Sequence, residues 1–310
     1  MQRILDPAQI EAFAQRAIPR IRLPDRESVF AARARRLREL SESHAMGHSI
    51  DEYLRLMAAV ADAQHSALAT FDAALPSAEQ LAQARLHRMP LVHAIGWQRE
   101  SQWRDLLNRL CDSVAALPEY PSSVRDVCAG LRHAQPAAIE TQADALLAAQ
   151  SDGVDAAAAP FVMAALQVYW VHLASRLAAK DVAELDVPGV CPTCGTLPVA
   201  SVVRADKRSQ GYRYLHCALC ATEWHMVRVT CSHCQSTQNI AYHSIEGDSE
   251  AIRAESCDHC KTYRKILYQE KDTDVEPVAD DLASLALDLL MGEAGYHRGS
   301  GNPLLWQHSS

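Results

Sequence analysis

The sequence has no long apolar run. No uninterrupted apolar segment approaches the roughly 18 residues that a transmembrane helix needs. The first residues, MQRILDPAQIEAF, also lack the apolar core of a secretion signal. These absences predict a cytoplasmic protein that does not insert into a membrane.

An excess of positive charge is missing as well. The 30 Lys and Arg residues stand against 38 Asp and Glu residues, which gives a formal net charge of −8. General nucleic-acid binders and membrane-surface binders need clustered positive charge. The composition therefore argues against both classes.

Motifs of common catalytic sites are also absent. There is no glycine-rich phosphate-binding loop and no Gly-x-Ser-x-Gly nucleophile elbow. Four histidines could be mistaken for general bases, but we expect them to pack or to form hydrogen bonds near a metal. They are His216, His225, His233 and His259. We predict no catalytic residue, no cofactor-binding loop and no enzymatic activity.

What the sequence does contain is cysteine in a regular pattern. Eight of its ten cysteines form four Cys-x-x-Cys pairs between Cys191 and Cys260. A shift of 40 residues carries the first two pairs onto the last two, and it also carries Thr222 onto Thr262. This pattern indicates an internal duplication of a four-thiolate unit.

The paired cysteines predict metal binding. Two sulfurs three positions apart on a tight turn, here called a knuckle, can point at one centre, and two knuckles make a tetrahedral site for Zn or a single Fe. The alternatives are structural disulfides and a thioredoxin-type dithiol, but the repeated quartet and the missing secretion signal favour metal. Connections between neighbouring segments of a fold rarely cross, so we expect the first four cysteines to share one ion and the last four to share the other, rather than an interleaved grouping. The candidate ligands are Cys191, Cys194, Cys217 and Cys220 for one ion, and Cys231, Cys234, Cys257 and Cys260 for the other.

Residues 1 to about 180 show helical patterns throughout. Ala is abundant, β-branched runs are short, and apolar residues recur at three- and four-residue steps between Pro and Gly breaks. We predict about six to eight helices with apolar stripes as core, and we expect Cys111 and Cys128 to be small core residues. The predicted helices begin at Asp6-Pro7, cover 28–43 and 50–71, begin again at Pro76-Ser77, and cover 101–116, 122–133, 136–150 and 155–180.

Arginines gather near the start of this region, where the only acids between them are Asp25 and Glu27. One interpretation is a docking face for an acidic partner or peptide. The other is a solvated helix face whose charges pair with acids elsewhere in this acidic protein. The arginines are Arg16, Arg20, Arg22, Arg26, Arg33, Arg35, Arg36 and Arg38.

The composition changes at Val187-Pro188-Gly189, where short strand-like segments replace the helical pattern. Each four-cysteine unit is too small to bury much core alone, so we expect its metal to supply much of its folding free energy. An acidic stretch then leads into a last helix over 282–290, and the end from Gly295 is expected to be partly loose. The predicted strands cover 199–204, 212–216, 225–229, 240–244, 251–255 and 264–268.

Four segments of the second half carry a resemblance to a known family. They are GYRYLHCALCATEWH at 211–225, AESC at 254–257, KILYQE at 265–270 and VADDLASL at 278–285. These segments, and all eight knuckle cysteines, resemble the formate dehydrogenase accessory protein (FdhE) family. The match is specific from about residue 188 to the C-terminal helix.

The resemblance implies a cytoplasmic protein with rubredoxin-like metal units. It also implies a partner, the catalytic subunit of a respiratory formate dehydrogenase, which carries molybdopterin, selenocysteine and an iron–sulfur cluster and is exported folded. The family is needed for an active enzyme but is not itself that enzyme.

Together these patterns give a fold class of α plus small β. An N-terminal all-helical domain precedes two tandem rubredoxin-like or zinc-ribbon four-cysteine units and a C-terminal helix. The predicted domains are residues 1–187 (helical), 188–230 (first metal unit), 231–270 (second metal unit) and 271–310 (acidic segment, helix and tail).

Three functions follow from this reading. The leading one is a maturation factor that binds its client before export. The second is a redox protein whose iron cycles between two oxidation states, which zinc does not do. The third, a zinc-ribbon nucleic-acid module, is disfavoured because acids and bases are mixed through 191–270. We predict two mononuclear metal ions, iron rather than zinc because of the resemblance to rubredoxins, and leave the oligomeric state open.

Overall fold

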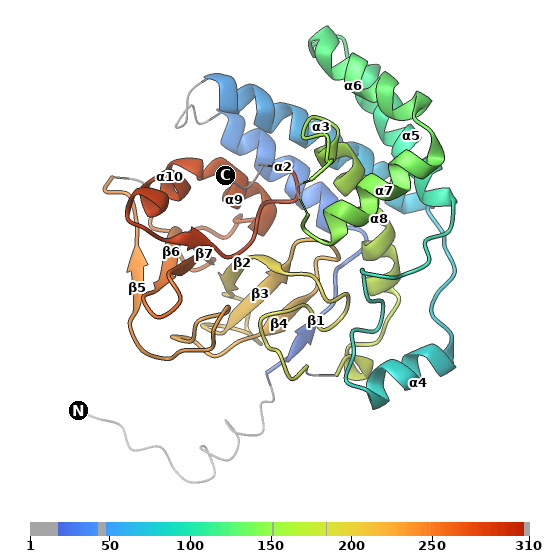
Figure 1. The fold of residues 1–310 in the computed structure, drawn as a ribbon. Coiled ribbons are helices and arrows are strands. Elements are labelled where there is room, and N and C mark those ends of the chain that lie inside the picture. The colour runs from blue at the N-terminus through green and yellow to red at the C-terminus, as the bar shows by residue number, and fades with distance from the viewer. Residues whose placement is uncertain (1–17, 43–47, 151, 184, 248, 307–310) are drawn as a thin grey trace, which may run out of the picture.

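A buried helix, α8 (Ala159–Ser175), forms the centre of the helical part in the computed structural model (Figure 1). The structure describes residues 18–42, 48–150, 152–183, 185–247 and 249–306. Every residue of α8 from its first to Ala174 is buried, as is typical of a helix that is apolar on all sides. Within the described residues, no helix combines the length and the apolar character needed to cross a membrane.

Other helices pack around α8. The pair α2 and α3 lies side by side, and α3, α5 and α7 each contact α8 (Figure 1). Helix starts follow local chemistry, because Ser77 caps α4 with a capping box and Pro136 stands in the first turn of α7. The bounds are α2 (Val29–Glu42), α3 (His48–Thr70), α4 (Ala78–Leu86), α5 (Gln102–Ala115), α6 (Ser122–His133) and α7 (Pro136–Leu147).

The helical prediction is confirmed for most of these elements. The predicted helix over 155–180 is shorter, since α8 ends at Ser175 and a 3-10 turn follows at Ala179–Asp181. The helix expected at Asp6-Pro7 lies outside the described residues. Cys111 on α5 and Cys128 on α6 are buried in the main core, as predicted.

The strands of the described residues form one sheet, in the order β1-β4-β3-β2-β7-β6-β5, with β8 pairing with β7. Each four-cysteine unit supplies three antiparallel strands, and the parallel pair β2–β7 joins the two units, with Ser201 opposite Ile266. Near the start of the described chain, β1 extends the sheet next to β4. The bounds are β1 (Ile21–Arg22), β2 (Pro198–Val203), β3 (Arg213–Cys217), β4 (Glu223–His225), β5 (Ile240–His243), β6 (Ile252–Cys257), β7 (Thr262–Tyr268) and β8 (His297–Arg298).

One strand was predicted in the wrong place. The third strand of the first unit covers Glu223–His225 rather than 225–229, because its partners on β3 and β1 end at this point. The chain then turns, and Val227 and Val229 are 64% and 50% exposed. Apolar composition alone misled the prediction here.

The C-terminal segment also differs from the prediction. The single last helix is two helices, α9 (Pro277–Ala283) and α10 (Leu285–Glu293), which are separated at Ser284. The end beyond Gly295 is not loose up to residue 306, because β8 pairs with β7 and Leu304 is buried. Asn302 also donates a hydrogen bond to the Val278 carbonyl at 2.9 Å.

Buried ion pairs join α2 to the C-terminal acidic segment. Arg33 is 1% exposed, and its Nε donates to Glu276 Oε1 at 3.1 Å. Glu276 in turn caps α9, since its Oε2 accepts the N–H groups of Val278 and Ala279.

A neighbouring arginine on α2 reinforces this join. Arg36 donates to Asp280 at 3.0 Å and to Asp272 at 2.6 Å. Arg33 and Arg36 pair with distant acids, as one of the two interpretations held, but the face they form is neither solvated nor free for docking. For these two residues the pairing with distant acids is confirmed, whereas the expected solvated face and the docking face are both wrong. Arg16 lies outside the described residues.

We expect Arg33→Met to lower the free energy of unfolding by about 3 kcal/mol, because it leaves the Glu276 carboxylate buried without its partner. The matched control is Arg35→Met on the same helix, where the side chain is 60% exposed and pairs with Glu39. That change should cost less than about 1 kcal/mol. Urea unfolding at pH 7 measures both values, and equal effects would contradict the buried pairing.

Candidate metal centres

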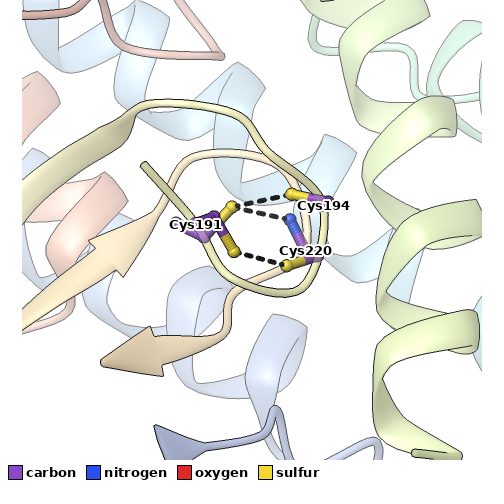
Figure 2. Close-up of side chains that lie close together, drawn as sticks. Cys191, Cys194 and Cys220 are labelled. Atoms are coloured by element: carbon purple, nitrogen blue, oxygen red, sulfur yellow. Dashed lines mark hydrogen bonds between the residues drawn. The ribbon is translucent and has the colours of Figure 1, made fainter. Parts of the chain in front are cut away.

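The first four-sulfur site joins two knuckles, one before β2 and one between β3 and β4. The sulfurs of Cys191 and Cys220 are 3.6 Å apart, and those of Cys194 and Cys217 are 3.4 Å apart. Figure 2 shows three of these side chains turned toward one shared space between the knuckles. A tetrahedral site with metal–sulfur bonds of about 2.3 Å has edges of about 3.8 Å, so these sulfurs fit one metal ion after a small expansion.

Hydrogen-bond donors surround the sulfurs of this site. The backbone N–H groups of Leu219 and Cys220 donate to Cys217 Sγ, each at 3.3 Å. The Thr196 hydroxyl lies 3.1 Å from both Cys194 Sγ and Cys217 Sγ. Such donors stabilise thiolates, which are the form that binds metal.

The two threonines that flank the first site were not predicted as part of it. The Thr222 hydroxyl is 3.2 Å from Cys220 Sγ, in addition to the Thr196 contacts. The recurrence of Thr222 as Thr262 after 40 residues was the sequence signal that pointed to one of them. The residue 40 positions after Thr196 is Ser236, which shares the hydroxyl group but not the residue type. The repeat therefore gives a weaker signal at this position.

Burial affects ionisation within this cluster. It raises the pKa of the Cys191 thiol well above its usual value. Burial also opposes ionisation of Cys217, but hydrogen bonds with the neighbouring cysteines outweigh it and hold the pKa of that thiol well below its usual value. A metal cation held among these sulfurs would supply the positive charge that allows all four thiols to ionise together.

The helical part covers this first site. The N–H groups of Val92 and Ala94 donate to the carbonyls of Thr193 and Cys194 at 2.9 and 2.8 Å. From α8, Gln167 Nε2 donates to the Ala218 carbonyl in the second knuckle at 2.7 Å. The four cysteines are at most 1% exposed and belong to the main hydrophobic core.

The second four-sulfur site repeats this geometry 40 residues later. The sulfurs of Cys231 and Cys260, and those of Cys234 and Cys257, are each 3.7 Å apart. In both sites the four sulfurs lie within 4.8 Å of one another, and the groups are sequential rather than interleaved. No disulfide joins any of the cysteines in the described chain.

The four histidines that accompany the knuckles lie in different surroundings. His216 Nδ1 is 3.0 Å from Glu223 Oε1. The ring of His225 contacts the rings of Tyr212 and Tyr214 edge-on. The other two, His233 and His259, are exposed.

Glu223 is the charged centre of β4, next to the first site. Its carboxylate accepts hydrogen bonds from Arg204 and is 4% exposed. Burial opposes its ionisation, but the charge of Arg204 and the hydrogen bond from His216 outweigh that effect and lower the pKa of Glu223 to about 2. The negative charge of Glu223 therefore stabilises the folded chain at neutral pH.

We expect Glu223→Gln to lower the free energy of unfolding at pH 7 by about 3 kcal/mol, which is the equivalent of moving the carboxyl pKa from 4.5 to about 2. A carboxyl group whose pKa is lower in the folded chain than in the unfolded chain stabilises the fold at pH values above its unfolded pKa. This stabilisation is lost as the pH falls toward its folded pKa. The difference in free energy of unfolding between parent and variant should therefore be largest above pH 4.5 and become smaller below that pH.

Urea unfolding between pH 3 and pH 7 measures this difference, with Glu270→Gln at an exposed position as the matched control. A pH-independent effect of Glu223→Gln would contradict the assignment.

Comparison with protein families covers nearly the whole described chain. The N-terminal model of the FdhE family matches residues 18–186, its central-domain model matches 190–228, and its C-terminal-domain model matches 229–305. The central model contains the first four-sulfur site, and the C-terminal model contains the second.

Similar proteins extend over the same length. A protein FdhE homolog of Cronobacter sakazakii is 42% identical, with 98% of this chain and 97% of the relative covered. Protein FdhE of Salmonella paratyphi A is 41% identical, with 93% and 92% covered. The crystal structure of the FdhE protein from Pseudomonas aeruginosa superposes with a TM-score of 0.79 at 38% identity, and it covers 93% of this chain and 99% of that one. The chain therefore belongs to the FdhE family, whose members are known as formate dehydrogenase accessory proteins.

Proposed function

We propose that this chain is a cytoplasmic maturation factor that binds the catalytic subunit of a respiratory formate dehydrogenase before export. Membership of the accessory-protein family over nearly the full chain is the observation that carries the proposal. In this role the chain is not an enzyme and acts by binding its client.

We further propose that each four-sulfur site holds one metal ion. The sulfur spacings, the amide donors and the absence of disulfides in the described chain support this assignment. The geometry accepts iron or zinc, and the resemblance to rubredoxin-like units favours iron. The ligands are Cys191, Cys194, Cys217 and Cys220, then Cys231, Cys234, Cys257 and Cys260.

The proposed organisation keeps four parts. The helical domain is 1–187, the metal units are 188–230 and 231–270, and residues 271–310 form the C-terminal segment. The buried arginines of α2 support a close association of the first part with the last.

Nucleic-acid binding receives no support from the sheet. Arg213 is fully buried and pairs with Glu255 at 2.8 Å, and Lys265 is buried and donates to Asp288 at 2.7 Å. Arg264 is 5% exposed. These cations stabilise the interior and do not contribute to a basic surface of the kind that binds phosphates.

A second candidate function is electron transfer to the client. The partial exposure of Cys234 and Cys260 favours it, because an iron at that site would lie near the surface. Zinc at both sites would eliminate this candidate, since zinc does not change its oxidation state.

Purification without oxygen, followed by elemental analysis and a visible spectrum, tests the metal sites. We expect two Fe per chain and thiolate-to-iron absorption in the oxidised form. Cys194→Ser should lose one equivalent and lower the melting temperature, because its site lies in the core. Unchanged metal content and melting would contradict the assigned ligands.

Deletion of the gene in its native host tests the proposed role. We expect loss of formate oxidation by the membrane fraction, restored by the full chain. A tagged copy should also copurify with the catalytic subunit from the cytoplasm. Normal formate oxidation in the deletion strain together with absence of the subunit from the purified fraction would overturn the proposal.

A further inference from the structure

The two four-sulfur sites differ in their exposure to solvent. All cysteines of the first site belong to the main hydrophobic core. In the second site, Cys231 and Cys257 are buried but lie outside that core, and Cys234 and Cys260 are only half-buried. One side of the second site is therefore open.

The residues inside the knuckles account for this difference. In the first unit they are Pro192-Thr193 and Ala218-Leu219, and Thr193 and Leu219 are at most 2% exposed beneath the helical part. At the same repeat positions the second unit has Ser232-His233 and Asp258-His259. His233, Asp258 and His259 are all exposed. Polar residues thus stand in the second unit where apolar or covered residues stand in the first.

The opposite side of the second site is firmly anchored. Arg264 Nε donates to Ser232 Oγ at 2.9 Å, and Arg213 donates to the Thr230 carbonyl at 2.9 Å. Gly189 packs directly against this turn, since a Cβ at that position would lie 2.3 Å from the Ser232 carbonyl oxygen. Solvent therefore reaches the second site from the Cys234–Cys260 side, while the backbone around Cys231 is held in place on the other side.

We propose that the second site is an exchangeable metal centre and that the first is a permanent structural one. This inference rests on the proposed occupancy of both sites by metal. The incoming group is a soft-donor ligand, with thiolate or imidazole groups, that approaches from the Cys234–Cys260 side.

The exchange is a ligand substitution with no change of oxidation state. The four cysteines would hold the ion, and on exchange each sulfur would keep the electron pair of its bond while the incoming ligand would supply the new donor pairs. The four released thiolates are then free to take protons from water. The chain could in this way give up or accept an ion while it remains folded.

The full chain loaded with two equivalents of zinc tests the inference when it is mixed with an excess of the chromogenic chelator 4-(2-pyridylazo)resorcinol. We expect one equivalent to leave at least about tenfold faster than the other, because release from the first site must follow opening of the core. The Cys234→Ser variant should bind one equivalent of zinc and release it only in the slow phase. The repeat-matched Cys194→Ser should show only the fast phase.

Because Cys194→Ser alters the core and can unfold the chain, a second measurement uses the unsubstituted protein. Iodoacetamide is added during the fast phase, and peptide mass spectrometry locates the alkylated thiols. We expect modification of Cys231, Cys234, Cys257 and Cys260 and protection of the first-site cysteines. Release of both equivalents at one rate, or early alkylation of Cys194, would overturn the inference and leave the proposed role in maturation intact. A chain that binds no metal would overturn the metal proposal as well.

Discussion

Four cysteine sulfurs lie together inside the hydrophobic core, and the packing of the helical part against the sheet is built around this buried cluster. The first site is covered by α8 through Gln167 and by the backbone at Val92 and Ala94. The helical part and the first sheet unit therefore share one hydrophobic core rather than meeting across a surface. The ion proposed at this site belongs to the interior of the fold, as a buried side chain does.

The duplication shows how equal ligand sets acquire unequal environments. Both units keep the same cysteine spacing and similar sulfur geometry. Because β2 pairs with β7, one continuous sheet contains both, and the first unit lies against α8 through Gln167. The residues between the cysteines diverged accordingly, with Leu219 under cover where His259 meets solvent.

The sequence was sufficient to predict features that depend on local chemistry. The Cys-x-x-Cys spacing indicated both quartets, and proline and capping residues indicated most helix starts. Features that depend on residues far apart in the sequence could not be predicted from it. Nothing near Arg33 indicates Glu276, and the end of β4 at His225 depends on pairing with β1 and β3. The buried Leu304 likewise depends on a tertiary environment that the local composition does not reveal.

The pairing of β1 with β4 has a consequence for the order of folding. Ile21 pairs with Trp224, and the arginines of α2 pair with acids around α9, so the first described elements of the helical part are completed by segments that are made much later. Such long-range closure slows folding and favours intermediates. A chain that lacks the segment around α9 also lacks the acids that pair with Arg33 and Arg36, so this segment completes the core around α2 only after it has been made.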